Sequence, residues 1–133
     1  DSNWVKLRSE QLGINKENYI TKKTEVNLDT VDSYCNTNSI NNINIMKIDT
    51  QLYEQQVLMG SENMIKNQKI DAIEIEIVFS SVYKKYVNFS DIEKYVLPYN
   101  YRFSGIELHN NSLFGGPIFF ADILFLNKSK FNL

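Results

Sequence analysis

The chain has 133 residues, of which 43% are hydrophobic and 13% aromatic, and its formal net charge at pH 7 is -2. This length and composition suit one ordinary hydrophobic core, so we expect a single domain over residues 1–133. The near balance of acidic and basic residues, without a basic run, excludes the electrostatic footprint of a nucleic-acid-binding protein. The apolar runs are shorter than the roughly 20 residues that cross a bilayer, and no signal-peptide pattern is present. We therefore expect a cytoplasmic protein with neither nucleic acid nor membrane among its partners.

The chain contains one cysteine, Cys35, and one histidine, His109. A single cysteine excludes an intrachain disulfide, and the two residues together cannot supply an ordinary zinc site. Cys35 lies at the end of a short predicted helix and is expected to be a small buried residue. His109 precedes two asparagines, which favours a surface loop residue over a catalytic base.

Strand and helix patterns alternate along the chain after an ambiguous N-terminal segment. The strongest strand signals are the β-branched run Ile43–Ile48 and the strict alternation within Ala72–Phe79. In chain order, the predicted elements are an extended run Thr24–Leu28, a short helix capped by Asp29 and continuing through Tyr34, the strand Ile43–Ile48, a helix over about Tyr53–Lys66, the strand Ala72–Phe79, a helix opened by the capping box Ser90–Glu93 and closed by Pro98, and two strands, Tyr101–Leu108 and Phe119–Leu126, joined by a loop with Gly115, Gly116 and Pro117. This order predicts an α/β fold.

The predicted helix Tyr53–Lys66 contains a glycine. Its apolar stripe, which should pack on the sheet, consists of Tyr53, Val57, Gly60 and Met64. A glycine inside a helix costs roughly 1 kcal/mol relative to alanine. We therefore expect Gly60 to mark a close approach of this helix to the sheet.

The stretch from Lys47 to Glu62 joins a strand, a carboxylate and a helix. It reads Lys-Ile-Asp-Thr-Gln-Leu-Tyr-Glu-Gln-Gln-Val-Leu-Met-Gly-Ser-Glu. This stretch resembles the signature of the FkbM family of S-adenosylmethionine-dependent methyltransferases, whose members read roughly Lys-Ile-Asp-x-x-Gly-x-Glu-x-x-Val-Leu-x-Gly-Ala-Glu. Shorter pieces agree in order and spacing, namely Val26–Asp29 followed by Ser33–Cys35, and Ile75–Ile77. The resemblance covers about residues 24–127.

The resemblance implies the C-terminal half of a class I methyltransferase domain. Such a half is a partial Rossmann-like sheet that is mostly parallel and ends in an antiparallel hairpin. The glycine-containing cofactor loop of the family follows an N-terminal strand, and this sequence has no counterpart to it. The cofactor-binding residues of this chain are therefore unassigned.

The resemblance also implies a function. S-adenosylmethionine would be the cofactor, and the acceptor would be a hydroxyl group on a saccharide or another small metabolite. The alternative is a noncatalytic module derived from such an enzyme, in which the half-sheet exposes an edge strand. A homodimer across that edge would then be carried by Val26–Leu28 or by Ile43–Ile48.

Four charged residues near the predicted strand ends are the candidate catalytic residues: Lys47, Asp49, Glu54 and Glu76. Asp49 would orient the acceptor hydroxyl or take its proton, and Lys47, on the same strand face, would keep that carboxylate ionised. Glu76 reaches the same level from the next strand, and Glu54 lies near the positive end of the helix dipole. The structural alternative is a buried Lys47–Glu76 pair that fixes the strand register, with Asp49 as a helix cap.

A metal is a weaker interpretation of the same residues. Asp49, Glu54 and Glu76 supply oxygen ligands, which would suit a hard cation such as magnesium or calcium. Their spacing is not diagnostic of a metal site, so none is predicted.

Leu52 stands where members of the FkbM family usually carry glycine. Glycine permits a positive φ angle or a close backbone approach to a ligand, and leucine would block either use. Two explanations stay open: the turn is ordinary helix in this chain, or the site has lost a ligand contact.

Overall fold

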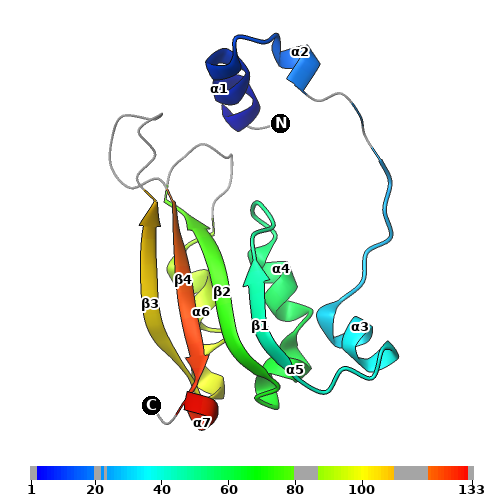
Figure 1. Cartoon of the computed structure of the whole chain (residues 1–133), viewed down its shortest axis with the longest axis vertical. Coiled ribbons are helices and arrows are strands. Elements are labelled where there is room, and N and C mark those ends of the chain that lie inside the picture. Colours follow the sequence, from blue (N-terminus) through cyan, green and yellow to red (C-terminus); the bar gives the residue numbers. More distant parts are fainter. Residues whose placement is uncertain (1–2, 20–21, 23, 80–86, 110–119, 132–133) are drawn as a thin grey trace.

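The computed structural model describes residues 3–19, 22, 24–79, 87–109 and 120–131. Its elements in chain order are α1 (Asn3–Leu12), α2 (Lys16–Tyr19), α3 (Val31–Thr37), β1 (Ile43–Ile48), α4 (Glu54–Met59), α5 (Glu62–Lys66), β2 (Ile70–Val78), α6 (Phe89–Glu93), the 3-10 helix η1 (Leu97–Tyr99), β3 (Tyr101–His109), β4 (Phe120–Asn127) and α7 (Lys128–Phe131). Figure 1 shows α1 and α2 apart from the sheet, beyond an extended segment that leads into α3. None of the described helices is long and apolar enough to cross a membrane.

The strands form one mixed sheet in the order β1-β2-β4-β3. β1 and β2 are parallel and are joined through α4 and α5, whereas β4 pairs antiparallel with both β2 and β3. The expectation of a mostly parallel sheet is therefore wrong for the described residues. The physical reason is that the chain makes one strand-helix-strand crossover, and the following hairpin places its second strand beside β2.

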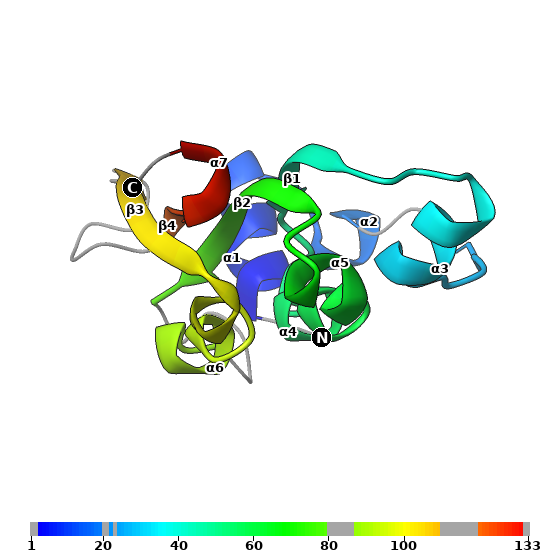
Figure 2. The ribbon, with the colours of Figure 1, turned by 90° about the horizontal axis from the view of Figure 1, so that it is seen from below.

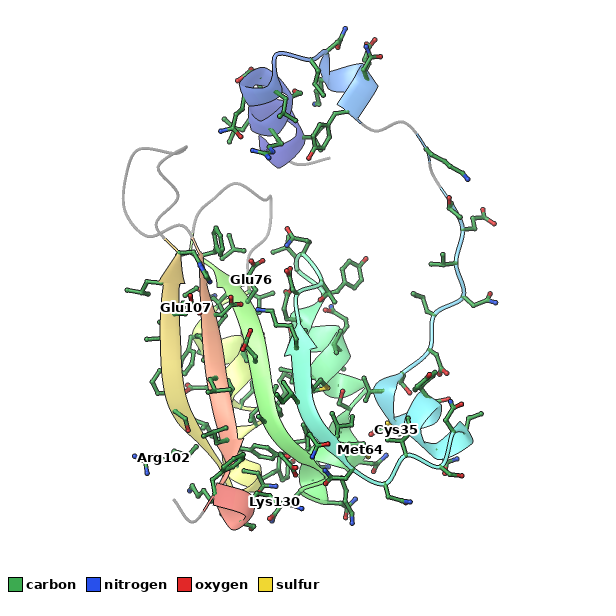
Figure 3. All side chains as sticks on the ribbon, viewed as in Figure 1. Cys35, Met64, Glu76, Arg102, Glu107 and Lys130 are labelled. Atoms are coloured by element: carbon green, nitrogen blue, oxygen red, sulfur yellow. The ribbon has the colours of Figure 1, made fainter. Side chains whose placement is uncertain are left out.

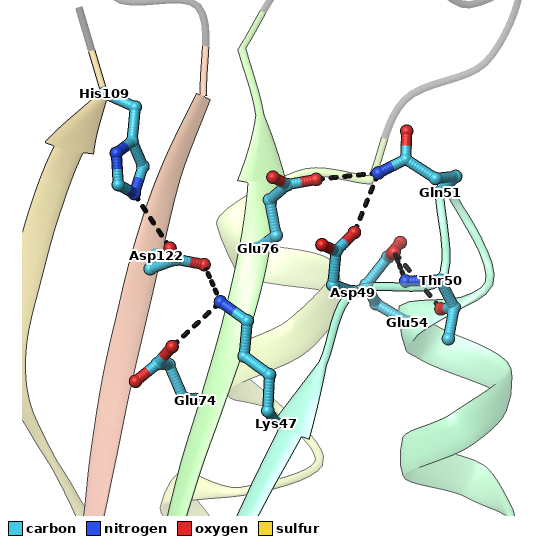
Figure 4. Close-up of polar contacts among 9 residues, drawn as sticks. All are labelled: Lys47, Asp49, Thr50, Gln51, Glu54, Glu74, Glu76, His109 and Asp122. Carbon is cyan, nitrogen blue, oxygen red and sulfur yellow. Dashed lines mark hydrogen bonds and ion pairs between the residues drawn. The ribbon is translucent and has the colours of Figure 1, made fainter.

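One face of the sheet packs against helices. α4, α5 and α6 all lie on this face (Figure 2). Side chains alternate along each strand, so every second residue points toward these helices. Ile48, Ile75, Ile123 and Phe125 are among the core residues that do so, and each is at most 2% exposed. The opposite face carries charged side chains near one end of the strands (Figure 4).

The strand predictions are largely confirmed. β1 has the predicted bounds, and the bounds of β2, β3 and β4 differ from the prediction by one or two residues. The run Thr24–Leu28 is not a strand, because it lies in an extended segment outside the sheet. The predicted loop with Gly115, Gly116 and Pro117 lies outside the described residues.

Two predicted helix caps move by one or two residues. Thr30, rather than Asp29, is the N-cap of α3, and its hydroxyl accepts a hydrogen bond of 3.1 Å from a backbone N–H in the first turn. Asp29 instead accepts from the backbone N–H of Thr30. Asn88 and Asp91 form the capping box of α6, in place of Ser90–Glu93. Several neighbouring residues can cap a helix, and tertiary packing selects among them.

α3 and α5 are tied together by a buried contact and by a side-chain cap. Cys35 of α3 is buried beside Met64 of α5, which confirms the expectation of a small buried cysteine (Figure 3). The carboxylate of Asp32 accepts hydrogen bonds from the backbone N–H groups of Asn63 (2.8 Å) and Met64 (3.0 Å). A residue of one helix therefore caps the start of the other.

The predicted helix Tyr53–Lys66 is interrupted at Gly60 and forms α4 and α5. The backbone N–H of Asp32 donates to the carbonyl of Gly60 at 2.9 Å, and a Cβ atom at Gly60 would lie 3.1 Å from Cβ of Thr30. Gly60 thus marks a close approach to the start of α3, not to the sheet. Tyr53 is exposed, so the predicted apolar stripe is packed only in part.

We expect Gly60→Ala to destabilise the protein by about 1 kcal/mol, since the overpacking penalty against Thr30 exceeds the gain in helix propensity. Urea unfolding of the variant and the wild type measures the difference. Gly105→Ala is the matched control, because its new Cβ would meet no atom closer than 3.9 Å. A Gly60→Ala protein as stable as the wild type would contradict the close approach.

Candidate functional site

The candidate site lies where β1 and β2 end side by side (Figure 4). In the parallel register Lys47 is opposite Glu74, and Ile48 is opposite Ile75. Asp49 follows Ile48 directly and therefore reaches the level of Glu76. In open α/β sheets, ligands bind outside the carboxyl ends of the strands.

Asp49 and Glu76 are bridged by one amide side chain. Nε2 of Gln51 donates to Oδ1 of Asp49 at 2.7 Å and to Oε2 of Glu76 at 3.0 Å. Burial, followed by the negative charge of Asp49 and a hydrogen bond with it, raises the pKa of Glu76 to about 7. The Glu76 carboxyl can therefore hold or release a proton near neutral pH.

The carboxylates that Lys47 contacts differ from those predicted from the sequence. Its ammonium points away from Asp49 and pairs with Glu74 at 2.8 Å and with Asp122 in a shorter contact (Figure 4). Burial alone would lower the pKa of Lys47, but the hydrogen bonds to Asp122 and Glu74 raise it. The expected Lys47–Asp49 contact and the alternative Lys47–Glu76 pair are both replaced by this arrangement, because the register sets Lys47 opposite Glu74.

Asp122 connects Lys47 to His109. Nε2 of His109 lies 2.8 Å from Oδ2 of Asp122, and the imidazole stacks on Phe120 with ring centroids 4.9 Å apart. Burial would raise the pKa of Asp122, but the hydrogen bonds from Lys47 and His109 lower it. The expectation of His109 in a loop is wrong, since His109 ends β3 and faces the neighbouring strand.

Sequence reasoning missed Asp122 and Gln51. An aspartate inside the apolar strand β4 was a usable signal, because such a residue needs a partner when it is part-buried. Its partner was not predictable, since Lys47 lies 75 positions earlier and reaches across β2. Gln51 carried no comparable signal.

Glu54 stabilises the turn between β1 and α4. It is 3% exposed, and its Oε1 accepts from the backbone N–H of Thr50 (3.0 Å), the hydroxyl of Thr50 (3.2 Å) and the backbone N–H of Leu52 (3.1 Å). Glu54, rather than Asp49, therefore accepts hydrogen bonds from the backbone N–H groups that precede α4. Of the four sequence candidates, Asp49 and Glu76 are brought together, whereas the polar contacts of Lys47 and Glu54 are with other residues.

The same turn excludes one of the two explanations for Leu52. Gln51 and Leu52 have φ angles of 52° and 85°, so the turn is not ordinary helix. Leucine thus occupies the left-handed region where the FkbM signature usually places glycine. A bulky residue in this region is strained, and the hydrogen bonds of the turn to Glu54 hold it there.

No group of three or more histidine, cysteine, aspartate or glutamate side chains in the described ranges is arranged to hold a metal ion. The oxygen atoms of Asp49 and Glu76 accept from the Gln51 amide, and those of Glu54 accept from the turn. Hydrogen bonding accounts for the geometry of these three carboxylates.

The fold and the site define an α/β chain with carboxylates gathered at the end of a parallel strand pair. The model of the methyltransferase FkbM domain matches residues 5–103. Because this match spans well over half of the 133 residues, the chain belongs to the FkbM methyltransferase domain family. Neither a curated protein nor a solved structure matches the chain.

We expect Leu52→Gly to be more stable than Leu52→Ala by about 1 kcal/mol, because only glycine adopts the 85° φ angle without strain. Both variants lose the leucine side chain beyond Cβ, so their difference reports mainly on the backbone. Chemical denaturation of the pair measures it. At an ordinary helical position alanine would be the more stable residue, and that order would contradict the strained turn.

Glu76 should make the stability of the protein depend on pH. Its pKa is about 7 in the folded chain and 4.5 ordinarily, so the folded state binds the proton more tightly. The resulting stability is fully present below pH 4.5 and is lost as the pH rises through 7. We expect a loss of roughly 1–2 kcal/mol, discounted for the partial exposure of Glu76.

Urea unfolding between pH 4.5 and pH 8 tests this expectation. Glu76→Gln removes the titrating group and should flatten that part of the profile. Glu107→Gln, a change of the same kind on β3, is the control and should keep the slope of the wild type. Equal slopes for wild type and Glu76→Gln would contradict the raised pKa.

Proposed function

We propose that this chain is an S-adenosylmethionine-dependent methyltransferase domain that methylates a hydroxyl group, with Asp49 and Glu76 at the acceptor. The observation that carries the proposal is the carboxylate pair bridged by Gln51, in which the pKa of Glu76 is about 7. Membership of the FkbM family supports the class of reaction.

A hydroxyl acceptor must lose its proton during methyl transfer. A general base works best when its pKa lies near the working pH, and Glu76 meets this condition. Glu76 accepts the hydroxyl proton on its carboxylate, and Asp49 accepts a hydrogen bond that orients the acceptor. Gln51 keeps the two carboxylates at a fixed separation. Lys47 acts indirectly, since it neutralises Glu74 and Asp122 beside the pair.

Carboxylates that accept hydrogen bonds suit an acceptor with several hydroxyl groups. Asp49 and Glu76 therefore support a saccharide or a similar polyhydroxylated metabolite as the acceptor. Asp122 and His109, on the neighbouring strands, add further polar groups near the same end of the sheet.

S-adenosylmethionine would supply the methyl group from its sulfonium centre. The carboxylate pair fits the positive charge of this cofactor, because Glu76 has a raised pKa beside Asp49 and gains from a nearby cation. Asp49 and Glu76 are the residues that would face this charge. No residue of the chain is assigned to the adenosine.

A noncatalytic role is the second candidate. It is favoured by Leu52, which fills the position where the family signature has glycine, and by β1, which forms an edge of the described sheet. In that case the chain would act through association with another chain, and the charged residues at the strand ends would have no catalytic role.

Calorimetric titration of S-adenosylmethionine and S-adenosylhomocysteine into the 133-residue chain separates the two candidates. We expect saturable binding at micromolar strength, followed by transfer of labelled methyl groups to a member of a saccharide panel. Glu76→Gln should lower that rate by roughly 100-fold, the size of a typical general-base contribution.

Glu107→Gln is the matched control for this experiment and should retain the rate of the wild type. Circular dichroism establishes that each variant is folded. A folded wild-type chain that binds neither ligand would contradict the enzyme proposal and favour the noncatalytic role.

A further inference from the structure

Apolar side chains are exposed beside β1. Ile45 of β1 is 71% exposed, and Tyr34 of α3, which lines the same groove, is also exposed. Exposed apolar side chains that gather in one place mark a candidate interaction site. This surface is therefore a candidate site for binding another chain.

A groove of about 480 Å³ runs between β1 and α3. Ile43, Ile45 and Met46 contribute its strand side, and Val31, Tyr34 and Ile40 contribute its opposite wall. An extended strand is the natural occupant, because β1 forms an edge of the sheet in the part of the chain that the structure describes, and such an edge can pair with a further strand.

The backbone of β1 is oriented for such pairing. Ile43 donates to the carbonyl of Lys69 at 2.8 Å, so Ile43 and the alternate residues after it face β2. In a parallel pair the intervening residues, Asn44, Met46 and Ile48, turn their backbone groups to the other side. These groups point toward the groove.

The chain itself contains a segment that matches the groove. Residues 24–28 are extended (Figure 1), are outside the sheet and are one residue shorter than β1. Val26 and Leu28 are 74% and 91% exposed, and their spacing puts both side chains on one face of an extended chain. Exposed apolar side chains on an extended backbone are the features of an unpaired strand.

We propose that two copies of this chain exchange this segment, so that Thr24–Leu28 of each copy adds to β1 of the other. Val26 and Leu28 enter the groove between β1 and α3, and the outward backbone groups of β1 gain hydrogen-bond partners. The exchange is reciprocal and forms two identical junctions.

Light scattering of the 133-residue chain across a wide concentration range tests the proposal. We expect a dimer whose dissociation constant rises at least about tenfold in Val26→Asp/Leu28→Asp, which alters the segment, and in Ile45→Lys, which alters the groove. Ile106→Lys is the control, because Ile106 is half-exposed on β3 at the opposite edge of the sheet. This control should dimerise like the wild type.

Mixing the two defective proteins distinguishes segment exchange from other dimers. The Ile45→Lys chain keeps an intact segment and the Val26→Asp/Leu28→Asp chain keeps an intact groove, so the mixture should form a heterodimer through one junction. Hydrogen exchange at Asn44 and Met46 should slow with increasing protein concentration.

Three results would overturn the proposal. They are a wild-type chain that is monomeric at every concentration, a Val26→Asp/Leu28→Asp chain that dimerises normally, and an Ile106→Lys chain that is monomeric. None of these results depends on cofactor binding, so the proposal and the enzymatic function succeed or fail separately.

Discussion

The parallel register of β1 and β2 is the constraint on which the rest of this structure depends. With Ile48 opposite Ile75, the apolar side chains of both strands face the helices, and the charged ones face the other way. A shift of one residue in either strand would turn Lys47 or Glu76 into the core, at a large desolvation penalty. The register that buries the isoleucines therefore also brings Asp49 level with Glu76.

Burial, followed by the distribution of charge on the polar face, explains why the pKa of Glu76 is raised. Lys47 is engaged by Glu74 and Asp122, and Asp122 is shared with His109. Asp49 and Glu76 are bridged by the neutral amide of Gln51, which offers hydrogen bonds but no positive charge. Ionising both of two neighbouring carboxyl groups in a part-buried site costs free energy, and this cost raises the pKa of one of them. Burial and the negative charge of Asp49 therefore raise the pKa of Glu76 to about 7, while Lys47 is engaged by other carboxylates.

The sequence allowed the strands to be predicted because their signal is local. β1 is a β-branched run, and β2 alternates around two glutamates, so period and composition suffice. The FkbM signature likewise placed Asp49 at a strand end. The break at Gly60 was not predictable, since it depends on Asp32 of another helix. The contacts of Lys47 were not predictable from the sequence either, because they require β4 to lie beside β2.

The central claim is that the carboxyl of Glu76, beside Asp49 at the end of the parallel strand pair, has a pKa raised to about 7. Titration of the Glu76 side-chain carboxyl by carbon-detected NMR, with Glu76→Gln for assignment, tests it most directly. We predict a midpoint close to 7, shifted toward 4.5 when Asp49→Asn removes the neighbouring charge. A midpoint near 4.5 in the wild-type chain, unchanged by Asp49→Asn, would contradict the account.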